Sequence, residues 1–202
     1  MDGKFTDVYI SSIPKELVIK PLASLVRNEE ISKASNERLK KEKYFVWRLL
    51  EYAISNSLGL NAENIKFEKL DSGRWRTAEF EFSLSHTDGA VAVAISSEPV
   101  GIDIELVKKP RSRSFAERIL TASELIKYES VTPAEREEYL IGKWTSKEAY
   151  FKSLHLSEFL PSMEVGADSK IQTKSVVFNG NRYIYSVATK IPIRVFGDIN
   201  LL

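Results

Sequence analysis

Val100-Gly101-Ile102-Asp103-Ile104-Glu105 carries the pattern from which the architecture follows. Apolar residues alternate in it with Gly101, Asp103 and Glu105, which is the period of a β-strand with one apolar and one acidic face. Residues two apart in a strand are separated by roughly 6.6 Å, so Asp103 and Glu105 point the same way and could share one cation. Oxygen ligands of this kind suit Mg²⁺. The alternative is an edge strand with solvated acidic side chains.

Gly101 has no side chain, which leaves room beside these carboxylates for a ligand or for another segment of backbone.

The composition is that of an ordinary globular protein. Of the 202 residues, 43% are hydrophobic and 28% charged, and this length allows one large domain or two small ones. A formal net charge of +1 gives no overall field that would recruit nucleic acid or a membrane. The absence of cysteine excludes disulfides and thiolate chemistry and fits a reducing cytoplasm. We see no signal-peptide pattern and no apolar run of the ~18 residues needed to span a bilayer.

Hydrophobic periodicity predicts the elements of the first half. We expect strands over residues 5–13, 65–70, 80–86 and 90–96, and a long helix over residues 31–58 with a basic side. Pro21 allows only a short helix between residues 17 and 26, or one that begins at the proline. Residues 85–96 read as a hairpin. Ser97-Glu98-Pro99 is the expected boundary between two domains, residues 1–98 and 99–202.

The second half is expected to begin with the acidic strand and a basic loop over residues 108–114. A helix over residues 115–128 follows, with a second N-cap inside it at Thr121. Another helix should run from Pro133 to Leu154. Strands are expected over residues 170–178 and 182–188, joined by the turn at residues 179–181, and one more over residues 191–195. The pattern strand–helix–strand–strand therefore occurs roughly twice.

Glu148 and Lys152 lie four residues apart, and hence on one face of the second of these helices. This spacing is also that of an ordinary surface ion pair, which contributes only a few tenths of a kcal/mol. Trp144 and Phe151 nearby indicate a packed helix that would hold the polar face rigidly.

Two further motifs could bind phosphate. Ser85 and His86 end an alternating strand, where a hydroxyl and an imidazole can donate hydrogen bonds to an anion. The turn Gly73-Arg74-Trp75 could offer a guanidinium to phosphate and an indole to an adenine. A lone histidine is otherwise more often structural, and we assign His155 to the surface at a helix end. The sequence has no Walker loop, dinucleotide fingerprint or glycosidase-like acid pair.

Together these pieces resemble the surfactin-synthetase-type 4'-phosphopantetheinyl transferases. The paired signature of that family resembles residues 101–105 and 143–152. Residues 83–86 resemble its upstream Ser-His motif, and residues 73–75 resemble its Gly-Lys-Pro turn. The order and approximate spacing also match, and the resemblance spans about residues 38–152.

The resemblance implies an α/β (α+β) pseudo-dimeric fold, with two similar halves and the active site between them. It implies an enzyme that transfers 4'-phosphopantetheine from coenzyme A to a serine of an acyl, peptidyl or aryl carrier protein, with Mg²⁺ as cofactor. The other product is adenosine 3',5'-bisphosphate. We expect a cytoplasmic monomer.

The same resemblance assigns the catalytic and metal-binding roles. Asp103, Glu105 and Glu148 would hold Mg²⁺ on the pyrophosphate. Glu148 is also the candidate for the base that takes the serine proton, directly or through water. Lys152 would balance charge on the transferring phosphate.

Coenzyme A would be bound by the remaining motifs. Ser85 and His86 would contact its phosphate, and the turn at residues 73–75 would lie near the adenine. Arg74 and Trp75 replace the Lys and Pro usual in the family; arginine keeps phosphate binding, and the change bears on the shape of the turn and on adenine contact. Lys41 and Arg48 are the candidates for gripping the 3'-phosphate.

Two other classes of function stay open at this point. One is a Mg²⁺-dependent phosphohydrolase that acts on a nucleotide with water as the nucleophile. The other is a non-catalytic relative that only docks a carrier protein. We expect carrier contacts within residues 108–114 and 129–137, because loops often carry recognition.

Overall fold

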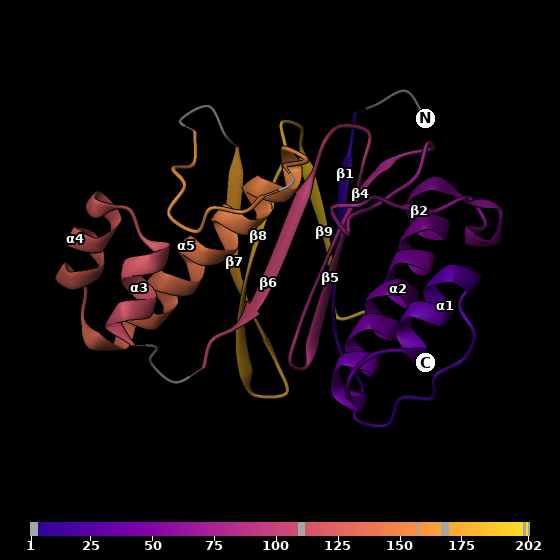
Figure 1. Cartoon of the computed structure of the whole chain (residues 1–202), viewed down its shortest axis with the longest axis horizontal. Helices are drawn as coiled ribbons and strands as arrows, with labels where there is room; N and C mark the ends of the chain where they lie inside the picture. Colours follow the sequence, from indigo (N-terminus) through magenta and orange to yellow (C-terminus); the bar gives the residue numbers. More distant parts are fainter. Residues whose placement is uncertain (1–3, 109–111, 157, 167–169, 200, 202) are drawn as a thin grey trace.

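Two β-sheets lie face to face in the middle of the molecule, with helices on their outer faces (Figure 1). This computed structural model describes residues 4–108, 112–156, 158–166, 170–199 and 201. The expected mixed α/β (α+β) class is confirmed. That the two halves are similar to each other stays a prediction.

The first sheet has the strand order β4-β5-β1-β9. Its strands are β1 (Thr6–Ser12), β4 (Glu81–Thr87), β5 (Ala90–Ser96) and β9 (Ile193–Gly197). β4 and β5 form the expected antiparallel hairpin, in which Gly89 takes a positive φ of 83° at the turn. Helix α2 (Glu37–Leu58) covers the outer face of this sheet, and α1 (Leu25–Ser32) packs beside α2.

The second sheet has the order β6-β8-β7, all antiparallel. Its strands are β6 (Gly101–Leu106), β7 (Ile171–Phe178) and β8 (Asn181–Ala188). Helix α5 (Pro133–Ser153) covers its outer face, and α3 (Arg113–Ile119) and α4 (Ala122–Ser130) pack on the far side of α5. Within the described residues, no helix is long and apolar enough to cross a bilayer.

Strand β5 shows how the sequence fits the layers, because all seven of its residues are buried. Val91, Val93 and Ile95 point into the core beneath α2. The alternate residues are the alanines at positions 90, 92 and 94, and they face the second sheet. Small side chains on this face let the two sheets approach closely, while the large ones fill the wider space below the helix.

Several predicted boundaries need correction. The helix expected over residues 31–58 begins at Glu37, because the side chain of Asn36 accepts a hydrogen bond from Leu39 N–H and caps it. The preceding residues form α1, capped by Ser24 and starting after Pro21. The strand expected over residues 65–70 shrinks to β2 (Glu68–Lys69), which pairs with β3 (Trp75–Arg76). A 3₁₀ turn, η1 (Ala62–Asn64), precedes β2.

The helix expected over residues 115–128 is two helices, α3 and α4, separated at Leu120 and Thr121. Thr121 and Glu124 form the predicted capping box, in which each side chain accepts a hydrogen bond from the other residue's N–H. The helix predicted from Pro133 is confirmed as α5.

After β8 the chain returns from the second sheet to the first. β9 lies parallel to β1, with Thr6 opposite Ile193, so residues 193–197 complete the first sheet. A division at residue 98 separates the other strands of the two sheets, but not this one. Arg194 on β9 donates two hydrogen bonds, of 2.7 and 2.8 Å, to the buried carboxylate of Asp7 on β1.

Candidate functional site

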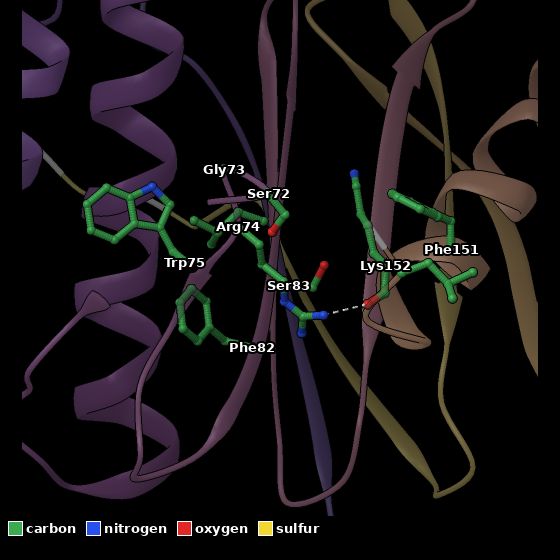
Figure 2. A pocket seen from close by; sticks show the side chains of 10 residues that line it. Ser72, Gly73, Arg74, Trp75, Phe82, Ser83, Phe151 and Lys152 are labelled. Carbon is green, nitrogen blue, oxygen red and sulfur yellow. Dashed lines mark hydrogen bonds between the residues drawn. The ribbon is translucent and has the colours of Figure 1, made fainter. Parts of the chain in front are cut away.

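A cavity of about 320 Å³ opens between the turn that precedes β3, strand β4 and the end of α5 (Figure 2). One wall comes from the first half of the chain and the other from the end of α5 and from Leu156 beyond it. The lining residues are Ser72, Gly73, Arg74, Trp75, Phe82, Ser83, Leu84, Phe151, Lys152 and Leu156. The cavity therefore joins two motifs, residues 73–75 and Lys152, that are far apart in the sequence.

Gly101 brings α5 onto β6. A Cβ atom at this position would lie 1.8 Å from the carbonyl oxygen of Ala149 and 2.7 Å from the backbone nitrogen of Ser153. No side chain fits there, and so the helix backbone rests directly on the strand. This contact places Glu148 and Lys152 beside the acidic strand, as the space expected next to Gly101 suggested.

Asp103 is the centre of the polar cluster and is only 5% exposed. Its Oδ1 accepts hydrogen bonds from the Ser85 hydroxyl and from the Lys152 ammonium, each at 2.8 Å. Lys152 Nζ also donates to the carbonyl oxygen of Ile102 at 3.0 Å. Asp103 Oδ2 is buried and has no hydrogen-bond partner among the described residues.

Glu148 and Glu105 add negative charge to this cluster. The pKa of Glu148 is raised to about 7. Burial is the largest cause, the charge of Lys152 opposes it, and the charges of Asp103 and Glu105 add to it. Glu105 accepts a hydrogen bond from the Thr87 hydroxyl at 3.1 Å. Three carboxylates thus influence one another electrostatically, and a positive charge placed among them would be stabilised.

The donor set fits a hard divalent cation, with one qualification. Within the described residues, no group of three histidine, cysteine, aspartate or glutamate side chains is gathered closely enough to hold a metal ion. Mg²⁺, however, commonly takes one or two carboxylates and completes its shell with water and substrate phosphate. The buried and unpaired Oδ2 of Asp103 is an oxygen of the kind that such an ion needs.

His86 lies on β4 next to α2. Its Nδ1 is 3.1 Å from Oε2 of Glu42, a carboxylate that is 4% exposed, and Glu42 is also paired with Arg38 at 3.1 Å. The carboxylate fixes the ring orientation and leaves Nε2 outside this pair. Sequence reasoning missed Glu42; the signal was one acidic residue four positions after Arg38 on an otherwise basic helix side.

The turn at residues 73–75 is anchored on both sides. Gly73 takes a positive φ of 83°, a conformation that favours glycine. The Arg74 guanidinium donates to the carbonyl oxygen of Lys152 at 3.1 Å, at the C-terminal end of α5 (Figure 2). Trp75 packs edge-on against Trp47, and the guanidinium of Arg27 lies 5.7 Å from the Trp75 ring. The indole is thus held against the first-half core.

The structure does not bring every candidate to this cavity. Ser85, His86, Asp103, Glu105 and Glu148 are not among its lining residues, although Ser85 and Asp103 contact each other next to Lys152.

Two candidates on α2 lie elsewhere. Arg48 is paired with Glu51 and lines a separate hollow with Pro21 and Leu60. Lys41 is half-buried on α2, next to Glu42. His155, expected at the surface, has a side chain that is 40% exposed and paired with Glu81 at 3.2 Å.

Comparison with known proteins adds an independent finding. Residues 99–185 match the sequence model of the 4'-phosphopantetheinyl transferase superfamily, and they contain β6, α5 and the four charged residues of the second half discussed above. This part of the chain, a little under half of it, is similar to that superfamily.

Among similar proteins are three bacterial enzymes. The 4'-phosphopantetheinyl transferase gsp of Aneurinibacillus migulanus is 32% identical over 126 residues, which are 62% of this chain and 52% of the relative. The 4'-phosphopantetheinyl transferase Sfp of Bacillus subtilis is 29% identical over 107 residues, 52% of this chain and 47% of the relative. A holo-[acyl-carrier-protein] synthase of Geobacillus kaustophilus is 42% identical over 62 residues, 27% of this chain and 48% of the relative. The chain spans about half the length of these relatives.

Proposed function

We propose that this chain is a 4'-phosphopantetheinyl transferase, which moves the 4'-phosphopantetheine group of coenzyme A to a serine of a carrier protein. The observation that carries the proposal is the meeting of Asp103, Glu148 and Lys152 beside a cavity that joins the two halves of the chain. Similarity to named 4'-phosphopantetheinyl transferases supports it.

The proposed reaction is a displacement at phosphorus. The serine oxygen of the carrier forms a bond to the phosphorus that carries pantetheine. The bond from that phosphorus to the bridging oxygen of the pyrophosphate breaks, and adenosine 3',5'-bisphosphate leaves with the bonding electrons. The serine proton passes to a base. Such transfers depend mainly on positioning and on neutralisation of charge.

Glu148 is our candidate for that base. With a pKa of about 7 it can accept a proton near neutral pH, where catalytic bases work best. Lys152 is fixed by Asp103 and by the Ile102 carbonyl, so that its ammonium is held in place to meet the transferring phosphate. We propose that Asp103 and one of the two glutamates, Glu105 or Glu148, hold Mg²⁺, which when bound would neutralise charge on the pyrophosphate.

The cavity would take coenzyme A. Arg74 supplies a fixed cation for a phosphate, and Trp75 offers a flat apolar surface at the same edge of the cavity. When both ring nitrogens carry a proton, His86 could donate to a phosphate through Nε2 while Nδ1 donates to Glu42. Lys41, the residue before Glu42 on α2, remains a candidate for the 3'-phosphate. Arg48 is less well placed for that role, because it is paired in another hollow.

Carrier recognition, a monomeric state, a cytoplasmic location and the absence of nucleic-acid partners stay predictions. Of the two segments expected to contact the carrier, residues 112–114 begin α3 and residues 129–137 join α4 to α5. Residues 109–111 lie outside the described residues.

The test is to incubate the chain with coenzyme A, Mg²⁺ and a panel of apo carrier proteins, and to follow the carriers by mass spectrometry. We expect at least one carrier to gain the mass of one phosphopantetheine group, and EDTA to prevent the gain. Release of adenosine 3',5'-bisphosphate without any carrier would favour the phosphohydrolase instead. Carrier binding with no mass change would favour a non-catalytic docking protein.

A further inference from the structure

We propose that Ser85 is a positioning residue that orients the Asp103 carboxylate toward a metal ion, and that its hydroxyl is not a ligand of coenzyme A phosphate. This inference rests on the proposed function, because it concerns the metal site of that reaction. It changes the role that the family resemblance implied for Ser85.

The bonding capacity of the Ser85 hydroxyl is already used. A serine hydroxyl carries one proton, and here that proton is donated to Asp103 Oδ1 at 2.8 Å. The same oxygen accepts the backbone N–H of Ile104 at 3.2 Å. The side chain is enclosed, since Ser85 is only 7% exposed. To donate to a phosphate, the hydroxyl would have to abandon Asp103 and leave a buried carboxylate oxygen with one partner fewer, which is costly.

The hydrogen bond from Ser85 makes the surroundings of the two carboxylate oxygens of Asp103 different. Oδ1 receives both Ser85 and Lys152, whereas Oδ2 has no partner among the described residues and is buried. Ser85 lies on β4 and Lys152 on α5, so the Asp103 carboxylate is hydrogen-bonded to two different elements. One oxygen is thereby fixed and the other remains available to a cation. Carboxylates that bind metals are commonly oriented by hydrogen bonds of this kind.

Ser83 provides an internal control for this role. It lies two residues before Ser85 on the same face of β4, and its hydroxyl accepts the N–H of Ile102 at 3.0 Å. Both serines therefore join β4 to β6, which belong to different sheets and have no backbone ladder between them. Only Ser85 continues to a carboxylate. A purely structural role would be common to both serines; a role in orienting Asp103 would belong to Ser85 alone.

The experiment compares the wild type, Ser85→Ala and Ser83→Ala as full chains. Mn²⁺ binding is measured by electron paramagnetic resonance with coenzyme A at saturating concentration, and thermal unfolding is recorded for each protein. The KM for coenzyme A is then measured at saturating Mg²⁺. We expect Ser85→Ala to weaken Mn²⁺ binding about 10- to 100-fold, the usual effect of losing a hydrogen bond to a metal ligand. Its KM for coenzyme A should stay close to that of the wild type.

We expect Ser83→Ala to lower the unfolding temperature to a similar extent without a comparable loss of Mn²⁺ affinity. Three results would overturn the inference alone: wild-type Mn²⁺ affinity in Ser85→Ala, equal loss of affinity in both variants, or a raised KM for coenzyme A with unchanged metal binding. If the wild type itself binds no Mn²⁺, the metal site of the proposed function fails, and the role of Ser85 fails with it.

Discussion

The raised pKa that suits Glu148 to its proposed role as a base also lowers the stability of the folded chain. Its pKa in the folded chain is raised to about 7, first by burial and then by Asp103 and Glu105. An unfolded chain would ionise the same group near pH 4.5. Between these values the folded state holds a proton that the unfolded state has lost. The Glu148 carboxyl therefore does not destabilise the folded state at low pH. The destabilisation grows as the pH rises from about 4.5 to about 7.

Replacing Glu148 with Gln should remove this cost in the absence of metal. At pH 8 we expect the free energy of unfolding of Glu148→Gln to exceed that of the wild type by about 1–3 kcal/mol. The difference should shrink toward pH 5. Urea denaturation at both pH values in the presence of EDTA measures it. Equal free energies of unfolding at pH 8 would mean that the surroundings of Glu148 do not disfavour its ionised form.

The ammonium of Lys152 has two alternative roles. It is either a cation that acts on the transferring phosphate or one half of an ordinary ion pair. Its contacts with Asp103 and with the Ile102 carbonyl favour the first. We expect Lys152→Ala to slow carrier modification by about 10²-fold or more, as loss of a charge that stabilises a transition state does. Lys33→Ala is the control, since Lys33 makes an exposed pair with Glu29 on α1. A loss no larger than that of the control would favour the ion-pair interpretation.

Among the elements, the contact between β6 and α5 positions the site. It depends on Gly101, since a Cβ atom there would lie within 1.8 Å of the backbone of α5. A backbone neighbour cannot rotate away as a flexible side chain can, so the helix as a whole would have to move off the strand.

Gly101→Ala should therefore destabilise the chain by about 2 kcal/mol or more. Gly197→Ala is the matched control, because a Cβ atom at Gly197 meets nothing within 4 Å and that residue also lies in a strand. Denaturant unfolding of both variants compares them. Similar free energies of unfolding for the two variants would show that α5 is not seated on β6 as described.

Local patterns in the sequence were sufficient for most elements and insufficient at their ends. The two-residue period of β6 and the proline at the start of α5 predicted both correctly. The start of α2 was placed too early because Ile31 continues the helical spacing, although Asn36 caps the helix after it. For the site, the sequence brought Asp103 and Lys152 together only through the family resemblance. The links from Glu42 to His86 and from Ser85 to Asp103 join residues 44 and 18 positions apart, and no local period encodes them.

At the scale of the whole molecule, the first sheet is completed by contacts that span nearly the full chain. β9 pairs with β1, and Arg194 binds Asp7 from 187 positions away. Sequence reasoning treated residues 99–202 as one unit, because parallel pairing with a distant strand leaves no local signal. This pairing adds a strand of the second half to the sheet that carries β4. The hydroxyls of Ser83 and Ser85 join β4 to β6, and α5 rests on β6 at Gly101.

We propose that a carboxylate from β6 and a cation from α5 act together in transferring phosphopantetheine. The most direct test is the rate at which wild type and Asp103→Asn modify a carrier protein with coenzyme A and Mg²⁺, followed by mass spectrometry. Asparagine keeps the shape of the side chain and removes its charge. We predict at least a 10²-fold slower reaction in Asp103→Asn, with an unfolding transition that remains cooperative. Modification by Asp103→Asn at the wild-type rate would contradict the account.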